Sequence, residues 1–217
     1  MQFNNKIETS SSQIASMLRQ AIITGELKPG TRLREAELCE SLNISRSPIR
    51  EAFRILEPEG LIQITPNKGV IVVQLDERDL REIYELRMLL EVHAVRIACN
   101  QMTQEDLDGL KALFQEMEKK LEIKDYVGYL KVSHDFHEYY IKKCENERLF
   151  NLFRILRNNI LGIQIFAYSY PDHSLDSLEE HKKILTALRK RDANKAEAYL
   201  RKHLESGYER AKRFLKK

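Results

Sequence analysis

Two arginines four residues apart suggest a surface that binds nucleic acid. Arg46 and Arg50 share one face of any helix that contains them, because four residues make about one turn. Ser45 and Ser47 lie at the start of this stretch, where they can cap the helix or meet phosphate oxygens. The opposite face is apolar: Ile49, Ala52, Phe53 and Leu56. An arginine can donate two hydrogen bonds to a base edge or a phosphate. By itself the stretch also fits an ordinary amphipathic helix, so its neighbours must decide.

Three histidines form a second set of residues with chemical potential. His137, His181 and His203 lie on the apolar stripes of three separate helical segments. A lone inward histidine is usually a hydrogen-bonded core residue, whereas three imidazoles in one bundle can bind a divalent metal ion and leave coordination positions open. The sequence alone leaves open whether the three side chains converge.

The segments before the arginines predict a helix-turn-helix. A first helix ends near Gly25, and Pro29-Gly30 forms a turn. A second helix covers residues 34–42, and Asn43 can take the left-handed conformation that ends it. The arginine helix follows almost at once. In this motif the later helix enters the major groove of DNA.

The segments after the arginines predict a β-hairpin wing. The arginine helix ends near Pro58, and short apolar runs at residues 61–64 and 70–73 flank a turn. Lys68 at the tip of this turn can reach phosphate, and Gly69 lets the backbone approach DNA closely. The expected first domain, residues 1–76, is therefore a winged helix-turn-helix of three helices plus a hairpin.

Everything after residue 77 predicts a mainly α architecture, with an all-α six-helix bundle as the second domain, residues 77–217. The expected helices are near 78–100, 103–122, 125–144, 147–169, 175–190 and 192–216. The fourth of these is the most apolar and is expected to run through the middle of the bundle.

Composition limits the possible classes of protein. The chain has no apolar run of membrane-spanning length and no signal peptide, so we expect a cytoplasmic protein with no membrane partner. Residues 1–76 hold nine basic and nine acidic residues, so bulk charge does not predict DNA binding there. The placement of individual arginines has to carry that prediction.

Residues 11 to 76 resemble the DNA-binding domain of the GntR-family transcriptional regulators. The resemblance rests on the turn that contains Pro29-Gly30, the SR-x-P-x-RE helix that starts at Ser45, an EGL motif at 59–61 and a P-N-x-G wing at 66–69. It implies that the residues which contact DNA are Arg46, Arg50, Ser45, Ser47, Asn67, Lys68 and Gly69.

Residues 80 to 215 are similar to the FCD effector domain of one GntR subfamily, and their length suits its shorter, VanR-type group. The resemblance implies that His137, His181 and His203 hold a divalent metal such as Zn, Ni or Mn, together with an Asp one turn before the first histidine. This chain has Ser133 at that position, and His134 and Asp135 are expected to face other sides of the helix. Serine is a poor metal ligand, so a metal site and a metal-free effector pocket both stay open.

Arg87 lies on an inward apolar stripe, where an unpaired guanidinium would be costly. Its partner is either Glu91, one turn away, or the carboxylate of an effector, which the organic acids bound by the family favour. Asn159, Gln164 and Tyr168 are further candidates to line an effector pocket.

These observations predict a homodimeric bacterial DNA-binding regulator, a repressor, that binds an operator of inverted symmetry and responds to a small carboxylate effector. One alternative is a metalloenzyme that uses the three-histidine site to activate water. Another is a DNA-binding architectural protein with a purely structural bundle.

Overall fold

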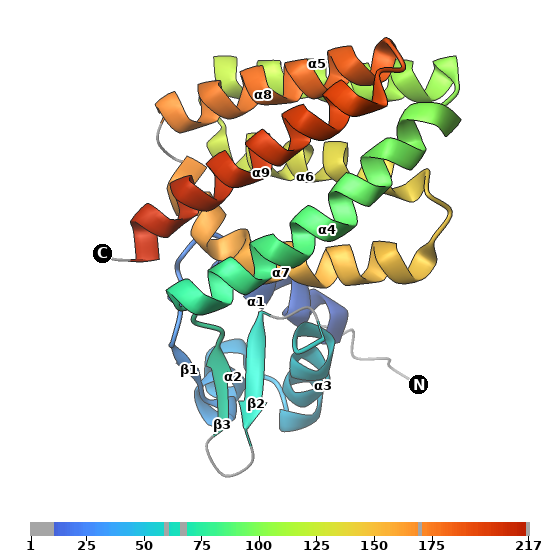
Figure 1. Ribbon diagram of the computed structural model, residues 1–217. Helices are drawn as coiled ribbons and strands as arrows, with labels where there is room; N and C mark the ends of the chain where they lie inside the picture. The colour runs from blue at the N-terminus through green and yellow to red at the C-terminus, as the bar shows by residue number, and fades with distance from the viewer. Residues whose placement is uncertain (1–10, 59–60, 66–68, 169–170, 216–217) are drawn as a thin grey trace. The chain divides into compact units, whose positions relative to one another are not determined.

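The computed structural model describes residues 11–58, 61–65, 69–168 and 171–215. Within these ranges the side chains of 23, 161–163, 165–168 and 214 are not described. The chain divides into two compact units, Met1–Gln74, here called the head, and Leu75–Lys217, here called the body (Figure 1). None of the helices in the described ranges is long and apolar enough to cross a membrane.

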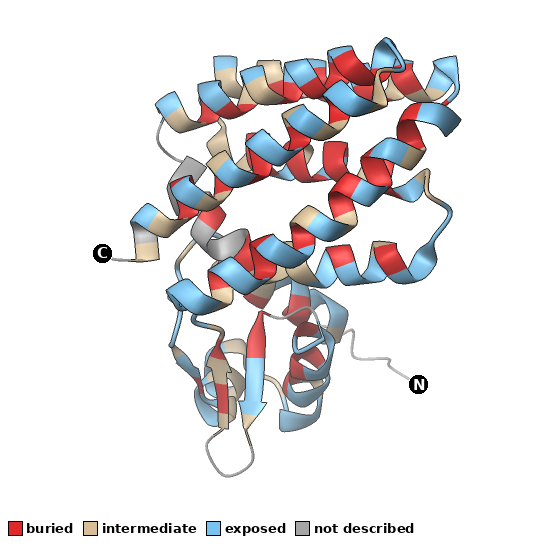
Figure 2. Ribbon diagram, in the orientation of Figure 1, coloured by how far each residue is buried: buried red, intermediate tan, exposed pale blue. Residues whose placement is uncertain are grey.

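The head contains the three predicted helices. They are α1 (Ser11–Ile23), α2 (Glu35–Leu42) and α3 (Arg46–Leu56). Both α1 and α2 pack on α3, whose inward face is buried as its apolar spacing predicts (Figure 2). Asn43 ends α2 with a φ of 52°, the left-handed conformation expected of it. The last residue of α3 is Leu56, close to the end expected at Pro58, but Glu57 before the proline still has helical φ and ψ angles of −63° and −48°, so Pro58 does not force its predecessor out of the helical region.

The predicted wing is a hairpin of β2 (Ile62–Thr65) and β3 (Gly69–Val72). A third strand, β1 (Arg32–Leu33), pairs with the other edge of β3, so the antiparallel order is β1-β3-β2. Two residues are too few to show strand periodicity, and for this reason the sequence pattern missed β1. The added strand anchors the hairpin to the segment that joins α1 to α2.

The body contains the six predicted helices in the described residues, although some ends differ. They are α4 (Glu77–Gln101), α5 (Gln104–Glu122), α6 (Tyr126–Lys142), α7 (Glu147–Tyr168), α8 (Pro171–Arg189) and α9 (Ala193–Leu215). Capping boxes formed by Asp76 with Asp79 and by Thr103 with Asp106 fix the starts of α4 and α5. The first residue of α8 is Pro171, earlier than expected, because proline suits a first helical turn.

The packing of the body corrects the position expected for α7. Leu152 and Ile155 on this helix are 53% and 42% exposed, so α7 does not run through the middle. Its high apolar content includes this outer face. Instead, α6 packs against α4, α5 and α7, and α9 packs against α4, α7 and α8. The histidines of α6, α8 and α9 are therefore on helices that share neighbours.

Candidate DNA interface and histidine site

The outward face of α3 carries the predicted DNA-contacting residues. Arg46, Arg50, Ser45 and Ser47 are all exposed. The Nε of Arg50 donates to both carboxylate oxygens of Glu35 on α2, at 3.0 and 2.9 Å. An exposed ion pair contributes only about 0–1 kcal/mol, so Glu35 orients this arginine without preventing a phosphate or a base from replacing it.

The two serines at the start of α3 do not cap it. Ser45 occupies the N-cap position, but its side chain makes no capping hydrogen bond, and Ser47 is already inside the helix. The expectation that they cap the helix was therefore wrong. Exposed hydroxyls at a helix N-terminus suit the other proposed role, which is to donate to phosphate oxygens.

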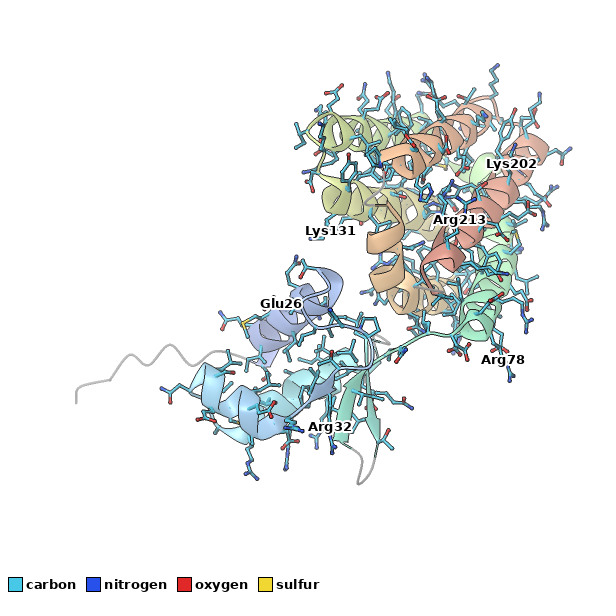
Figure 3. The ribbon with its side chains drawn as sticks, turned by 90° about the vertical axis from the view of Figure 1, so that its left-hand side faces the viewer. Glu26, Arg32, Arg78, Lys131, Lys202 and Arg213 are labelled. Atoms are coloured by element: carbon cyan, nitrogen blue, oxygen red, sulfur yellow. The ribbon has the colours of Figure 1, made fainter. Side chains whose placement is uncertain are left out.

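Strand β1, which pairs with the wing, carries an arginine, Arg32, that the sequence reasoning missed. Gly69 has a φ of +89°, and a Cβ placed on it would lie 3.3 Å from the Nε of Arg32. The positive φ favours glycine at this position, whereas the exposed Arg32 side chain could move by the few tenths of an ångström that a Cβ would need. Figure 3 shows Arg32 on the sheet of the head, where it is exposed. Asn67 and Lys68 lie outside the described residues.

The three predicted histidines converge in the body. One ring nitrogen from each of His137, His181 and His203 lies within 4.8 Å of those from the other two. The Nε2 atoms of His137 and His181 are 3.1 Å apart, and the ring centroids of His181 and His203 are separated by 4.4 Å. All three side chains are buried.

The other nitrogen of each histidine has its own partner. His137 Nδ1 lies 2.6 Å from Glu91, His181 Nδ1 lies 2.7 Å from the carbonyl oxygen of Ser177, and His203 Nδ1 lies 2.8 Å from Glu180. An acceptor at Nδ1 holds the proton there and leaves Nε2 with its lone pair. This is the arrangement by which proteins prepare imidazoles as metal ligands.

Each of the two carboxylates in this shell is also paired with a buried arginine. Arg87 lies 2.7 Å from Glu91, and Arg210 binds both oxygens of Glu180 at 3.1 and 2.7 Å. Burial by itself would raise the pKa of Glu91, but Arg87 and His137 hold that pKa far below its usual value. Glu91 is therefore ionised. Of the two partners considered for Arg87, Glu91 or an effector carboxylate, the structure shows Glu91.

Burial also governs the histidines. It lowers the pKa of His181 and of His203 well below the usual value, and the neighbouring histidines lower both further. Neutral imidazole is the form that binds metal. These two side chains are thus ready to bind a cation at neutral pH.

Two neighbours on α6 complete the site. Ser133 Oγ lies 3.1 Å from His181 Nε2, the same atom that lies 3.1 Å from His137 Nε2. His134 was expected to face another side of the helix, and this expectation was wrong. Its side chain is buried, lines the same cavity as His137, and places Nε2 2.8 Å from Gln164. The correction has a simple reason, since residues three apart on a helix are neighbours and His134 precedes His137 by three.

A small cavity of about 10 Å³ adjoins the histidines. The residues that line it are Tyr84, Arg87, Leu130, Ser133, His134, His137, Gln164, His203, Leu204 and Gly207. Two of the four candidate effector residues, Arg87 and Gln164, line this cavity. Asn159 is half-buried on α7 and is not among the described residues around the cavity, and the side chain of Tyr168 lies outside the described part.

The donor set fits a divalent metal. Nitrogens bound to a tetrahedral zinc lie about 3.3 Å apart, given Zn–N bonds of about 2.0–2.1 Å, and the closest pair here is separated by 3.1 Å. Ser133 replaces an anionic ligand with a neutral hydroxyl. The chemistry of the site is therefore that of three imidazoles with room for exchangeable oxygen ligands.

The two units of the chain match two family models. Residues 10–72 match the gntR family of bacterial regulatory proteins, and residues 82–206 match the FCD domain. The chain belongs to the GntR family of transcriptional regulators, with an FCD domain as its body. Its head is thus a DNA-binding domain.

Curated relatives and solved structures agree with this classification. The chain is 30% identical over 204 residues to the HTH-type transcriptional regulator YdhC of Bacillus subtilis, covering 94% of this chain and 91% of that one. It is 26% identical to the transcriptional repressor RspR of Escherichia coli, over 93% and 88% of the two chains. The structure of E. coli McbR/YncC superposes with a TM-score of 0.76 at 25% identity, over 90% and 93%. Both curated relatives are named as transcriptional regulators, so the metalloenzyme alternative has no support from them.

Proposed function

We propose that this regulator is a homodimeric repressor whose hold on an operator of inverted symmetry is released by a small carboxylate bound in the body. The observation that carries the proposal is the convergence of three buried imidazoles, two of which, His137 and His203, line a cavity that the buried Arg87 also lines. Such a site attracts a cation and an anion together. A protein that binds the bacterial chromosome acts in the cytoplasm, where we place it.

The metal part of the proposal rests on the prepared Nε2 atoms. His137, His181 and His203 would hold a divalent ion, and Ser133 would face one of its remaining positions. When bound, the ion supplies a positive centre to which a carboxylate can coordinate. Whether Zn, Ni or Mn is preferred depends on ligands that the chain does not itself provide. Assignment to the VanR-type group stays a prediction.

The anion part of the proposal rests on Arg87. Its guanidinium is buried against Glu91 at 2.7 Å and also borders the cavity. An effector carboxylate could accept a hydrogen bond from this fixed donor without ordering a flexible side chain. We infer that binding there shifts α4 or α6, whose inner faces carry Arg87, Ser133 and His137, and so alters the two heads of the dimer.

The proposal is tested by measuring whether a carboxylate releases the protein from its operator. Fluorescence anisotropy with a labelled operator should show that metal-loaded protein loses affinity when a cognate carboxylate is added, whereas the His181→Ala protein keeps its operator affinity and no longer responds. Operator binding that ignores both metal and every acid tested would favour the architectural alternative instead. Metal analysis of the purified protein tests the ion separately.

A further inference from the structure

The cavity beside the histidines is too small for an organic acid. Its volume of about 10 Å³ corresponds to roughly one water molecule. Ligand pockets usually measure about 300–1,000 Å³. An acid that reaches Arg87 therefore has to open one wall of this cavity or leave most of its own atoms outside it.

A second hollow lies on the other side of such a wall. It is an apolar groove of about 380 Å³ between α4 and α9, lined by Arg81, Tyr84, Glu85, Met88, Leu89, Leu204, Glu205 and Tyr208. Its walls are mainly aliphatic and aromatic, and its charged residues are exposed. Tyr84 and Leu204 line both the cavity and the groove. These two side chains are thus the partition between a polar site and an apolar one.

Within this partition, Tyr84 is held by one interaction on each side. Its hydroxyl accepts a hydrogen bond from Gln164 Nε2 at 3.2 Å, on the cavity side. Its ring packs edge-on against Tyr208 on the groove side, with centroids 5.7 Å apart. On α9, Gly207 also lines the cavity, and a residue with a larger side chain there would reduce the cavity volume. Rotation of the Tyr84 side chain would break the hydrogen bond from Gln164 and remove one of the two side chains that separate the cavity from the groove.

We propose that the α4–α9 groove receives the apolar tail of the effector, with Tyr84 as the gate between tail and carboxylate. The inference rests on the proposed function, because it takes the carboxylate to lie at Arg87 and the histidines. The ligand class is then a monocarboxylate with an unbranched alkyl or an aryl tail. A compact acid that is polar throughout would leave the groove empty and gain nothing from it.

A chain-length series tests the proposal on the full-length, metal-loaded protein. Affinities for acetate, butanoate, hexanoate and 3-phenylpropanoate should tighten along the series, by roughly fourfold for each methylene that enters the groove. Leu89→Glu should weaken hexanoate binding at least tenfold and leave acetate unchanged. Leu89 is 69% exposed, so the variant should fold. The matched control is Leu152→Glu, on the outer face of α7.

A single introduced tryptophan can report independently where the acid binds, because the sequence contains no tryptophan of its own. In the Leu89→Trp variant, emission excited at 295 nm should shift on addition of hexanoate but not of acetate. The Leu152→Trp protein, whose reporter is on α7, should not respond to either acid.

The outcomes separate the two proposals. If acetate and hexanoate bind equally well, or if the two tryptophan reporters respond alike, the tail site is overturned and the proposed function stands. If no carboxylate binds, the proposed function fails and takes the tail site with it. If Leu89→Glu converts a dimer to a monomer in light scattering, the groove is the contact between two copies and the inference is overturned.

Discussion

At the scale of single residues, two carboxylates in the body each hold one arginine and one histidine in place. Glu91 holds both Arg87 and His137, and Glu180 holds both Arg210 and His203. The imidazoles keep their Nε2 atoms for the shared site because their Nδ1 atoms are occupied. The orientation of the arginines and histidines in the body therefore depends on the two carboxylates that hold them.

The first prediction concerns one of these carboxylates. Glu180→Gln removes the charge that fixes the tautomer of His203, and we expect metal affinity to fall by about 10–100-fold. Competition with a chromogenic chelator measures it. Glu179→Gln is the control, because Glu179 is exposed on the same helix. Equal affinities in the two variants would contradict the role given to Glu180.

The second prediction concerns acid. Burial holds the pKa of His134, and likewise of His181 and His203, well below 6.5. Below pH 6.5 the unfolded chain therefore binds more protons than the folded one. Stability is fully present above that pH and is lost as the pH falls, by up to about 1.4 kcal/mol per pH unit for each histidine.

Denaturant titrations of metal-free protein between pH 7.5 and 5.5 measure this loss. His134→Gln should show a shallower pH dependence than the parent, and His93→Gln, at an exposed position, should match the parent. An unchanged slope in His134→Gln would show that the buried imidazole is not responsible.

At the scale of elements, α3 is a platform with one buried and one exposed face. Its apolar face is covered by α1 and α2, and the arginines of the other face cannot turn inward without losing that packing. Glu35 of α2 adds a lateral restraint on Arg50. The helix-turn-helix is thus rigid where it meets DNA.

The third prediction tests this platform. Arg46→Ala and Arg50→Ala should each lose about 1–3 kcal/mol of specific operator affinity if the guanidinium contacts a base. If it contacts phosphate instead, binding should weaken on all sequences and the salt dependence should fall by about one counterion. Anisotropy titrations at several salt concentrations distinguish the two. Arg201→Ala on α9 makes the same charge change in the body and should leave operator affinity intact.

Elements whose residue pattern continues over several turns or a whole strand could be predicted from the sequence. Elements that depend on tertiary contacts could not. The amphipathic stripes of α4 to α9 and the β-branched runs of the hairpin are local patterns, so their existence was predictable. The two-residue strand β1 depends on a partner some forty residues away, so it left no pattern. The same division holds at the site: the histidine stripes were visible, whereas the partners Glu180 and the carbonyl of Ser177 required the fold.

At the scale of the whole molecule, one head can read only one half of a symmetric operator. A dimer of this chain would place two copies of α3 on half-sites separated by about one helical turn of DNA or a multiple of it. Exposed leucines on the body outside the α4–α9 groove, such as Leu86 on α4 and Leu175 on α8, show that apolar surface is available for contact between two copies.

The fourth prediction follows from this geometry. Light scattering of the full-length protein should give the mass of two chains, and removal of one half-site from the operator should weaken binding more than tenfold. Insertion of five base pairs between the half-sites should have the same effect, because it places them on opposite faces of the duplex. Equal affinity for one and two half-sites would rule out a symmetric dimer.

The hydroxyl of Ser133 gives the histidine site an unusual electrical character. The two carboxylates nearby are each paired with an arginine, and no carboxylate is among the described residues that line the cavity, so these residues supply no anionic ligand to a doubly positive metal ion. We expect an anion to be what restores neutrality, so that each guest strengthens the hold on the other. Operator release would then be strongest when the metal ion and the anion are present together.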